Sequence, residues 1–401
     1  MQTFTNKTII TLVAGFFVSI VSVIGLVNWK NMQTKSEFSD TQNIQTVVRP
    51  AQANAIKQDF STIYYADIQA DRNDEYGVPT NITFYNYNIR TKERKEIFAL
   101  PANKLDISDF SPNFQFCPIS NKIYLRRVWT DDERIAEIDL QGTVKDLDFT
   151  STHSSLYKDW SHLGNYFVLS NDCKKIIWST YYYEVVDRNP TNGVNEIVLS
   201  NVDGTGREIL QGVTRSIPDR TGNKVLKWFA NNLYLTNDGW GYLYARPGGL
   251  YKLDITNRSV SKINTIPSQN IIWDVSPNGD LIAHQEKTLN GTSNSFITNI
   301  LDDSKMILQD KSDGQMKFSP DDRYLAHIVN DPEKPILYVA DFNSKTDKIF
   351  SRNAIVLDWL SKDTVIALRN GKDLLTINIK DGKENSIAST TSHLILVGLS
   401  K

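Results

Sequence analysis

The chain has 401 residues, a formal net charge of −2 at pH 7 and an isoelectric point near 6.2. Hydrophobic residues at 40% and charged residues at 22% are typical of a globular protein, which excludes a wholly disordered chain. The nearly balanced charge argues against a nucleic-acid-binding protein, since such proteins usually carry a basic face, and we expect no nucleic-acid partner.

The first element is an apolar segment from Ile9 to Val27, which would form a helix of roughly 28 Å, about one bilayer core. The small-residue stretch at residues 51–55 lies too far beyond this segment for a signal-peptide cleavage site. We therefore expect residues 1–30 to be an uncleaved transmembrane signal anchor, which we favour over a cleaved signal peptide. The expected location is a bacterial cell membrane, crossed once, with the bulk of the chain on the extracytoplasmic side.

Residues 31–59 are rich in Gln, Thr, Ser and Asn, without apolar periodicity, and we interpret them as a flexible polar linker. From Phe60 onward the chain changes to short alternating apolar runs such as "NITFYNYNI" and "ILYVADF", separated by turn residues. Tyr 17, Phe 17 and Trp 8 also favour strands. The expected domain, residues 60–401, is all-β.

A short motif repeats through this domain: an apolar anchor, a small residue and a turn, best seen in "VSPNGDLIAH" and "FSPDDRYLAH". We place its small residue at Ser111, Ser161, Ala230, Ser276, Ser319, Ser361 and Ser400. A period of about 40–45 residues with four strands per unit is the mark of a β-propeller. Ser-Pro followed by Asn-Gly or Asp-Asp supplies the turn chemistry.

The two ends of the domain complete each other. Residues 60–102 contain three strands without a preceding motif, and the final "SHLILVGLSK" is an inner strand with nothing after it. Joined, they would make one blade that closes the ring and removes free sheet edges. With six internal motifs, this predicts a seven-bladed β-propeller, favoured over six or eight blades, behind a single transmembrane helix.

The repeats resemble the WD40-like β-propeller repeats of TolB-type proteins, on the stretches "FSPDDRYLAHI", "VSPNGDLIAH", "FSPN" and "NVDGTGREIL". The resemblance covers about residue 60 to the C-terminus and is strongest over residues 270–350. It implies an exported binding or scaffolding module. The chain departs from TolB in its N-terminal anchor and in lacking an N-terminal α/β domain, so a Tol–Pal role is not carried over.

His284 and His327 occupy the same place in adjacent repeats, eight residues after the motif serine. A two-histidine metal or acid–base site is one interpretation. The favoured one is that each ring replaces a phenylalanine in packing between blades, because no third ligand occurs at comparable spacing. We expect no metal and no cofactor.

The residue just before the anchor is charged in six repeats. These residues are Asp109, Asp159, Lys227, Asp274, Lys317 and Asp358, and Val397 takes the place in the closing blade. On an inner strand this position faces away from the anchor, towards the central channel. We consider two interpretations: a charged ring that binds a cationic or polar ligand, and a structural ring of paired charges, the favoured one.

Aromatic residues in long loops are a second candidate surface for peptide or sugar recognition, and we single out Tyr182, Trp240 and Tyr242. The two cysteines, Cys117 and Cys173, fall near equivalent inner hairpins of adjacent repeats. They would form a disulfide in an oxidising compartment or remain buried thiols otherwise, and the sequence leaves both open.

The chain carries no G-x-S-x-G elbow, HExxH, CxxC pair or Walker loop. We therefore expect a membrane-tethered extracytoplasmic propeller that binds or scaffolds a protein, peptide or glycan, and we lean against an enzyme. The alternative is a glycan- or peptide-directed hydrolase or lyase that uses carboxylates of Asp109, Asp159, Asp274 and Asp358 at the channel mouth.

Overall fold

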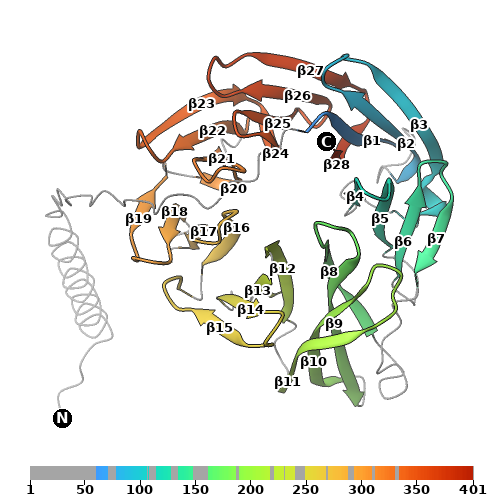
Figure 1. Cartoon of the computed structure of the whole chain (residues 1–401), viewed down its shortest axis with the longest axis vertical. Coiled ribbons are helices and arrows are strands. Elements are labelled where there is room, and N and C mark those ends of the chain that lie inside the picture. The colour runs from blue at the N-terminus through green and yellow to red at the C-terminus, as the bar shows by residue number, and fades with distance from the viewer. Residues whose placement is uncertain are drawn as a thin grey trace, which may run out of the picture. The chain divides into compact units, whose positions relative to one another are not determined.

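Seven four-stranded antiparallel sheets follow one another around a ring in the computed structural model, as Figure 1 shows. The structure describes residues 60–400 except 71–77, 106, 108–113, 128–133, 148–160, 187–188, 217–220, 230, 240–248, 268–269, 288–292, 309–311 and 330–333. The expected anchor (residues 1–30) and linker (residues 31–59) lie outside the described residues. Among the residues described, no helix is long and apolar enough to cross a membrane.

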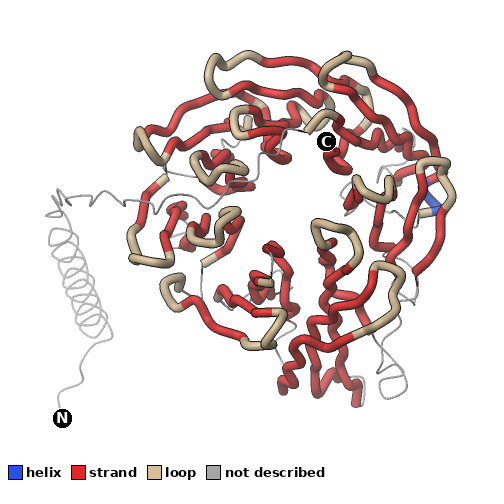
Figure 2. The backbone as a smooth tube through the Cα atoms, in the orientation of Figure 1, coloured by secondary structure: helices blue, strands red, loops and turns tan. Residues whose placement is uncertain are grey.

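Blade 1 joins the two ends of the propeller and confirms the predicted closure. Its strands are, from the centre outward, β28 (His393–Ser400), β1 (Thr62–Ala70), β2 (Pro79–Asn88) and β3 (Arg94–Pro101). Thr62 pairs with Ser400 and Ile68 with His393. A short 3₁₀ helix, η1 (Ala102–Lys104), follows β3 and is the helical turn drawn in Figure 2.

The other six blades are each built from consecutive strands. Blade 2 contains β4 (Phe114–Cys117), β5 (Lys122–Arg127), β6 (Arg134–Asp139) and β7 (Val144–Leu147), and blade 3 contains β8 (Ser161–Leu169), β9 (Lys175–Val186), β10 (Asn189–Asn201) and β11 (Glu208–Ser216). Blade 4 contains β12 (Thr221–Phe229), β13 (Asn232–Gly239), β14 (Leu250–Asp254) and β15 (Val260–Ile263).

Blades 5 to 7 repeat the same order. Blade 5 contains β16 (Ile271–Val275), β17 (Leu281–Lys287), β18 (Ser293–Asn299) and β19 (Lys305–Ile307). Blade 6 contains β20 (Ser312–Phe318), β21 (Tyr324–Val329), β22 (Ile336–Asp341) and β23 (Thr346–Arg352), and blade 7 contains β24 (Ala354–Ser361), β25 (Thr364–Arg369), β26 (Asp373–Asn378) and β27 (Glu384–Ser389). The all-β, seven-bladed prediction is confirmed.

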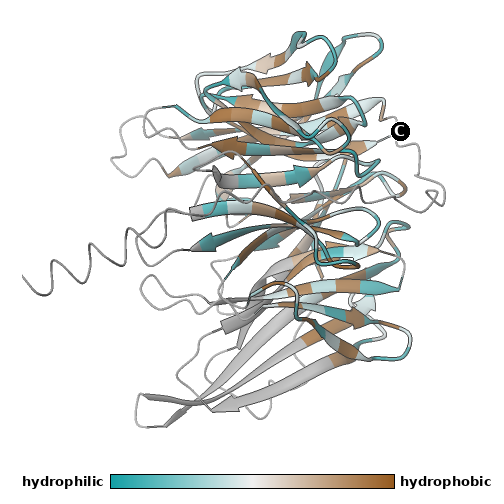
Figure 3. Cartoon of the chain, turned by 90° about the vertical axis from the view of Figure 1, so that its left-hand side faces the viewer, coloured by the Kyte–Doolittle hydropathy of each residue, from teal (hydrophilic) through white to brown (hydrophobic). Residues whose placement is uncertain are grey.

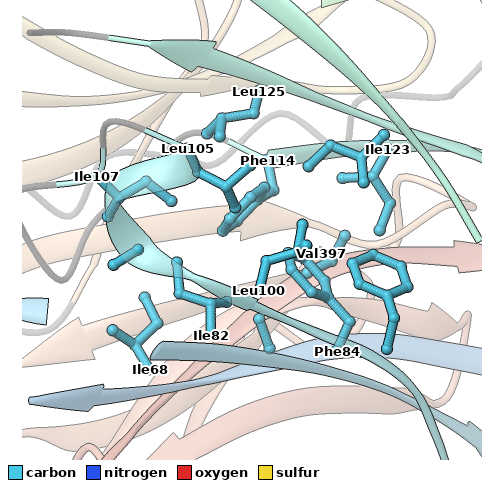
Figure 4. Close-up of a cluster of buried hydrophobic side chains, with 14 of the residues drawn as sticks. Ile68, Ile82, Phe84, Leu100, Leu105, Ile107, Phe114, Ile123, Leu125 and Val397 are labelled. Atoms are coloured by element: carbon cyan, nitrogen blue, oxygen red, sulfur yellow. The ribbon is translucent and has the colours of Figure 1, made fainter. Parts of the chain in front are cut away.

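The core is divided among the junctions between blades, because both faces of each sheet pack against a neighbour. Figure 4 shows the cluster between blades 1 and 2, where Phe84 and Val397 meet Phe114 and Ile123. A second cluster joins Ile63 and Tyr65 of blade 1 to blade 7, which completes the ring. In Figure 3 the hydrophobic residues follow the strands and the hydrophilic ones gather in the connecting turns.

Motif serines hold the turns of the inner hairpins in blades 5 and 6. In blade 5, the Ser276 amide donates to the carbonyl of Leu281 at 2.8 Å, and the Leu281 amide donates to Ser276 Oγ at 3.0 Å. Ser319 bonds in the same way to Tyr324 in blade 6. Three residues after each serine the backbone is left-handed, at Gly279 with φ 78° in blade 5 and at Asp322 with φ 57° in blade 6.

The same turn appears in blade 3 at Ser170, not at Ser161. The Lys175 amide donates to Ser170 Oγ at 3.0 Å, and the left-handed position is Cys173 with φ 54°. Ser161 instead begins β8. In blade 2 the inner hairpin turns after Cys117, whereas Ser111 lies before β4 and outside the described residues. The motif placement at Ser111 and Ser161 was therefore wrong, because these turns use "CPISN" and "SNDCK" in place of Ser-Pro.

Candidate functional site

The channel ring is described at Lys227, Asp274, Lys317 and Asp358, while Asp109 and Asp159 lie outside the described residues. These four side chains come from the innermost strands of blades 4 to 7, β12, β16, β20 and β24. Their charges alternate in sign from blade to blade. Lys227 and Asp274 form an ion pair, and the carboxylates of Asp274 and Asp358 both act on the charge of Lys317.

Asp274 is the buried carboxylate of the described part of the ring, with only 4% of its surface exposed. Its Oδ1 forms an ion pair with the ammonium of Lys227 at 3.0 Å, and its Oδ2 accepts a hydrogen bond from the backbone amide of Phe318 at 2.9 Å. The Lys227 ammonium also donates to the carbonyl of Val275 at 2.7 Å. Asp274 therefore joins the inner strand of blade 5 to blade 4 on one side and to blade 6 on the other.

Lys317 and Asp358 continue the ring into blade 7. Burial alone would lower the pKa of Lys317, but the carboxylates of Asp274 and Asp358 outweigh it, so the pKa is raised and the ammonium stays charged. Asp358 is exposed, and its Oδ1 accepts the amide of Trp359 at 2.8 Å. The Trp359 indole donates to the carbonyl of Lys317 at 2.8 Å, which links blades 6 and 7.

Gln115 does in blade 2 what Asp274 does in blade 5, and the sequence analysis missed it. It stands two residues before the hairpin turn, accepts the Leu169 amide at 3.1 Å and donates to the carbonyl of Phe167 in blade 3. The same register places Val168, an apolar residue, at this position in blade 3. The Asn-Lys pair after Cys117 marks the turn between β4 and β5, and counting back two residues from Cys117 would have identified Gln115 from the sequence.

Both oxygens of Asp274 are thus occupied by donors, whereas the exposed Asp358 accepts the amide of its sequence neighbour Trp359 through Oδ1. A retaining or inverting glycosidase needs two carboxyl groups that are free to exchange protons across a substrate. Asp274, buried and bonded through both oxygens, is unsuited to this role. The geometry favours the structural interpretation of the ring.

His284 and His327 are buried within separate blades and do not form a joint site. Each ring stacks on the aromatic residue directly across the hairpin, Phe296 or Tyr338, with ring centroids 5.5 Å apart in both cases. His327 Nε2 contacts both oxygens of Asp347, at 3.0 and 2.9 Å. Among the described residues, no group of three or more His, Cys, Asp or Glu side chains could hold a metal ion.

His284 is held as a neutral ring. Its Nε2 lies 2.8 Å from Thr298 Oγ1, and its Nδ1 lies 2.9 Å from the side-chain nitrogen of Asn270. Burial, and to a smaller extent Lys305, lowers the pKa of His284 to about 4. Its two nitrogens therefore serve packing and hydrogen bonding, as expected for a histidine in an aromatic position.

The aromatic candidates are placed only in part. Trp240 and Tyr242 lie outside the described residues. Tyr182 belongs to β9, where its backbone pairs with Val194 on one side and Ser161 on the other, and its side chain is not described. These residues stay sequence predictions.

Cys117 and Cys173 are joined by a disulfide, with Cα atoms 6.0 Å apart. Cys117 ends β4 in blade 2, and Cys173 lies in the β8–β9 turn of blade 3, so the bond links two neighbouring inner hairpins. Of the two states that the sequence left open, the structure has the bonded one.

No family model matches the chain, and no curated protein matches it in sequence. Solved structures share its fold. A TolB structure from Acinetobacter baumannii is 19% identical with a TM-score of 0.43, and the aligned part is 72% of this chain but only 63% of that one.

Two peptidase structures superpose better. A puromycin-hydrolyzing peptidase from Mycobacterium tuberculosis is 12% identical over 85% of this chain and 55% of that one, with a TM-score of 0.51. Prolyl oligopeptidase B from Galerina marginata is 12% identical over 84% of this chain and 52% of that one, with a TM-score of 0.52. At such identities the likeness shows the fold alone: this chain contains a β-propeller.

Proposed function

We propose that the protein is a membrane-tethered, extracytoplasmic β-propeller that binds a protein, peptide or glycan and has no catalytic activity of its own. The observation that carries the proposal is the engagement of Asp274 through both oxygens, to Lys227 and to Phe318 of the next blade. A ring committed to joining blades leaves the propeller surface, and not the channel charges, for recognition.

Two further observations support the location. The disulfide between Cys117 and Cys173 suits an oxidising compartment, where such bonds persist. The apolar segment from Ile9 to Val27 has the length of a bilayer-spanning helix and would supply the tether.

The test uses the affinity-tagged full-length chain. Proteins and glycans that co-purify with it are identified by mass spectrometry, and each candidate is then titrated in purified form against the chain. We expect one candidate to bind saturably with fixed stoichiometry, and we expect no turnover of peptide or glycan substrates. Turnover that Asp358→Asn abolishes would instead establish the hydrolase or lyase alternative, and the absence of any saturable ligand would remove the binding proposal.

A further inference from the structure

A pocket of about 380 Å³ opens where blades 6 and 7 meet, away from the charged ring. Its apolar wall comes from Pro335, Ile355 and Leu368, and its polar groups come from Lys334, Asn353 and Asn370. Asn353 and Ile355 lie at the start of β24, where the chain passes from blade 6 into blade 7. Asp358 lies further along the same strand, towards the inner hairpin turn.

The polar side of the pocket is built from backbone that is fixed before any ligand arrives. Asn353 and Asn370 are both left-handed, with φ of 59° and 52°, a conformation in which asparagine is enriched. The Asn370 amide donates to the carbonyl of Asn353 at 2.9 Å, which ties the β25–β26 turn to the connection between blades. A preformed site loses little conformational entropy when a ligand binds.

Asn353, which lines the pocket, has a side-chain acceptor without a donor. Its Oδ1 is buried and receives no hydrogen bond. A buried amide oxygen without a donor is unfavourable, and a ligand N–H or O–H that reached it would remove that penalty. The pocket therefore fits a ligand that brings a donor beside an apolar group.

Lys334 is the one charged side chain among the described residues that line the pocket. Lys334 lines the pocket with its side chain exposed, and the exposed Arg352 and Lys372 stand next in sequence to lining residues. None of these three has an ion-pair partner in the described part of the chain. An acidic group on the ligand would therefore find a favourable potential at this edge.

We infer that this pocket docks an extended peptide, which packs one aliphatic side chain on the adjacent Ile355 and Leu368, donates a backbone N–H to Asn353 and places a carboxylate near Lys334. The volume is at the small end of ligand pockets and suits one side chain with its flanking backbone. The lining contains no aromatic ring, the platform on which the apolar face of a sugar packs best, so a peptide is favoured over a glycan.

This inference rests on the proposed binding function and names the class of partner. The probe is the peptide acetyl-Gly-Gly-Leu-Asp-Gly-Gly-amide, titrated against the full-length chain and followed by saturation-transfer NMR. We expect a Kd on the order of 0.1–1 mM for so short a ligand. Replacing its Leu by Ser should weaken binding about tenfold, and replacing its Asp by Asn about two- to fivefold.

Variants of the chain locate the site. Asn353→Gly keeps the left-handed backbone and removes the acceptor, and should weaken both the acidic and the neutral peptide about five- to tenfold. Lys334→Glu changes an exposed side chain and should weaken only the acidic peptide. The matched control is Lys348→Glu, an exposed lysine on β23 of the same blade, which should bind as the unmodified chain does.

Three results would overturn the inference. These are no peptide binding at concentrations of about 10 mM, equal binding by Asn353→Gly and the unmodified chain, and a loss in Lys348→Glu as large as that in Lys334→Glu. Binding of chitotetraose that Asn353→Gly abolishes would assign the pocket to glycans instead. If these peptides fail while the full-length chain still forms a saturable complex with a purified partner, only the pocket assignment is lost and the binding function stands.

Discussion

Replacing Asp274 tests whether the charged ring holds the blades together. Asp274→Ala leaves the buried amide of Phe318 without an acceptor, which costs about 1–3 kcal/mol. It also removes the partner of Lys227, whose side chain is 27% exposed and keeps its bond to Val275, so this loss lies below that of a fully buried pair. We expect unfolding to become easier by roughly 2–4 kcal/mol in total.

The measurement is urea unfolding followed by the fluorescence of the 8 tryptophans. Asp274→Asn, which keeps an acceptor, should cost about 1 kcal/mol, and Lys227→Met a similar amount. In a double-mutant cycle, Asp274→Ala and Lys227→Met should couple by about 1–2 kcal/mol. A loss below about 0.5 kcal/mol for Asp274→Ala, or no coupling between the two sites, would refute the structural role.

Three other predictions concern His284, the disulfide and the closing blade. The pKa of His284 falls from 6.5 to about 4 on folding, so between these pH values the unfolded chain binds more protons than the folded chain. The contribution of the neutral His284 to the free energy of unfolding is therefore full above pH 6.5. It decreases as pH falls towards 4, by roughly 3 kcal/mol. His284→Phe should flatten this part of the curve of unfolding free energy against pH, and an unchanged slope would exclude the histidine as its source. Replacing Cys117 and Cys173 by Ser opens a loop with a sequence separation of 56 and should cost about 4 kcal/mol in the same assay, while titration of thiols in the unmodified, denatured chain should find none. Gly398→Ala would place a Cβ 2.4 Å from Phe116 Cβ and should lower the free energy of unfolding by about 1–3 kcal/mol. The control Ser386→Ala changes an exposed side chain and should leave stability unchanged. Equal stability of the two variants would contradict the close packing of β28 on blade 2.

The repeat could be read from the sequence because a few turn residues are chemically demanding. Ser276 and Ser319 each bond to the residue that starts the next strand, and Gly279 and Asp322 adopt the left-handed backbone, so these blades share a visible pattern. The closing blade could also be predicted, because a final inner strand without partners must pair with the strand at the other end. Hydrophobic alternation and turn chemistry were sufficient for the fold.

In blades 2 and 3 the sequence did not predict the position of the inner hairpin turn. Their hairpins turn at "CPISN" and "SNDCK", several residues after the predicted motif positions Ser111 and Ser161. Gln115 was missed because it is uncharged, although it makes the same kind of bond to the next blade as Asp274. The partners of these side chains lie on a neighbouring blade, and no spacing along the chain reveals them.

The pocket at the junction of blades 6 and 7 was likewise not accessible from the sequence. Its apolar wall joins residues from two blades, and Asn353 and Asn370 belong to connections that carry no motif. What makes Asn353 notable is a missing hydrogen bond, which is a property of the folded structure and not of its residue type.

We claim that recognition occurs at the junction of blades 6 and 7 and that the charged ring is architectural. The most direct test is the dissociation constant of acetyl-Gly-Gly-Leu-Asp-Gly-Gly-amide for the unmodified chain, Asp358→Asn and Asn353→Gly, measured side by side. We expect Asp358→Asn to bind within twofold of the unmodified chain, and Asn353→Gly to bind about five- to tenfold more weakly. Weaker binding by Asp358→Asn together with unchanged binding by Asn353→Gly would place recognition in the channel and contradict the claim.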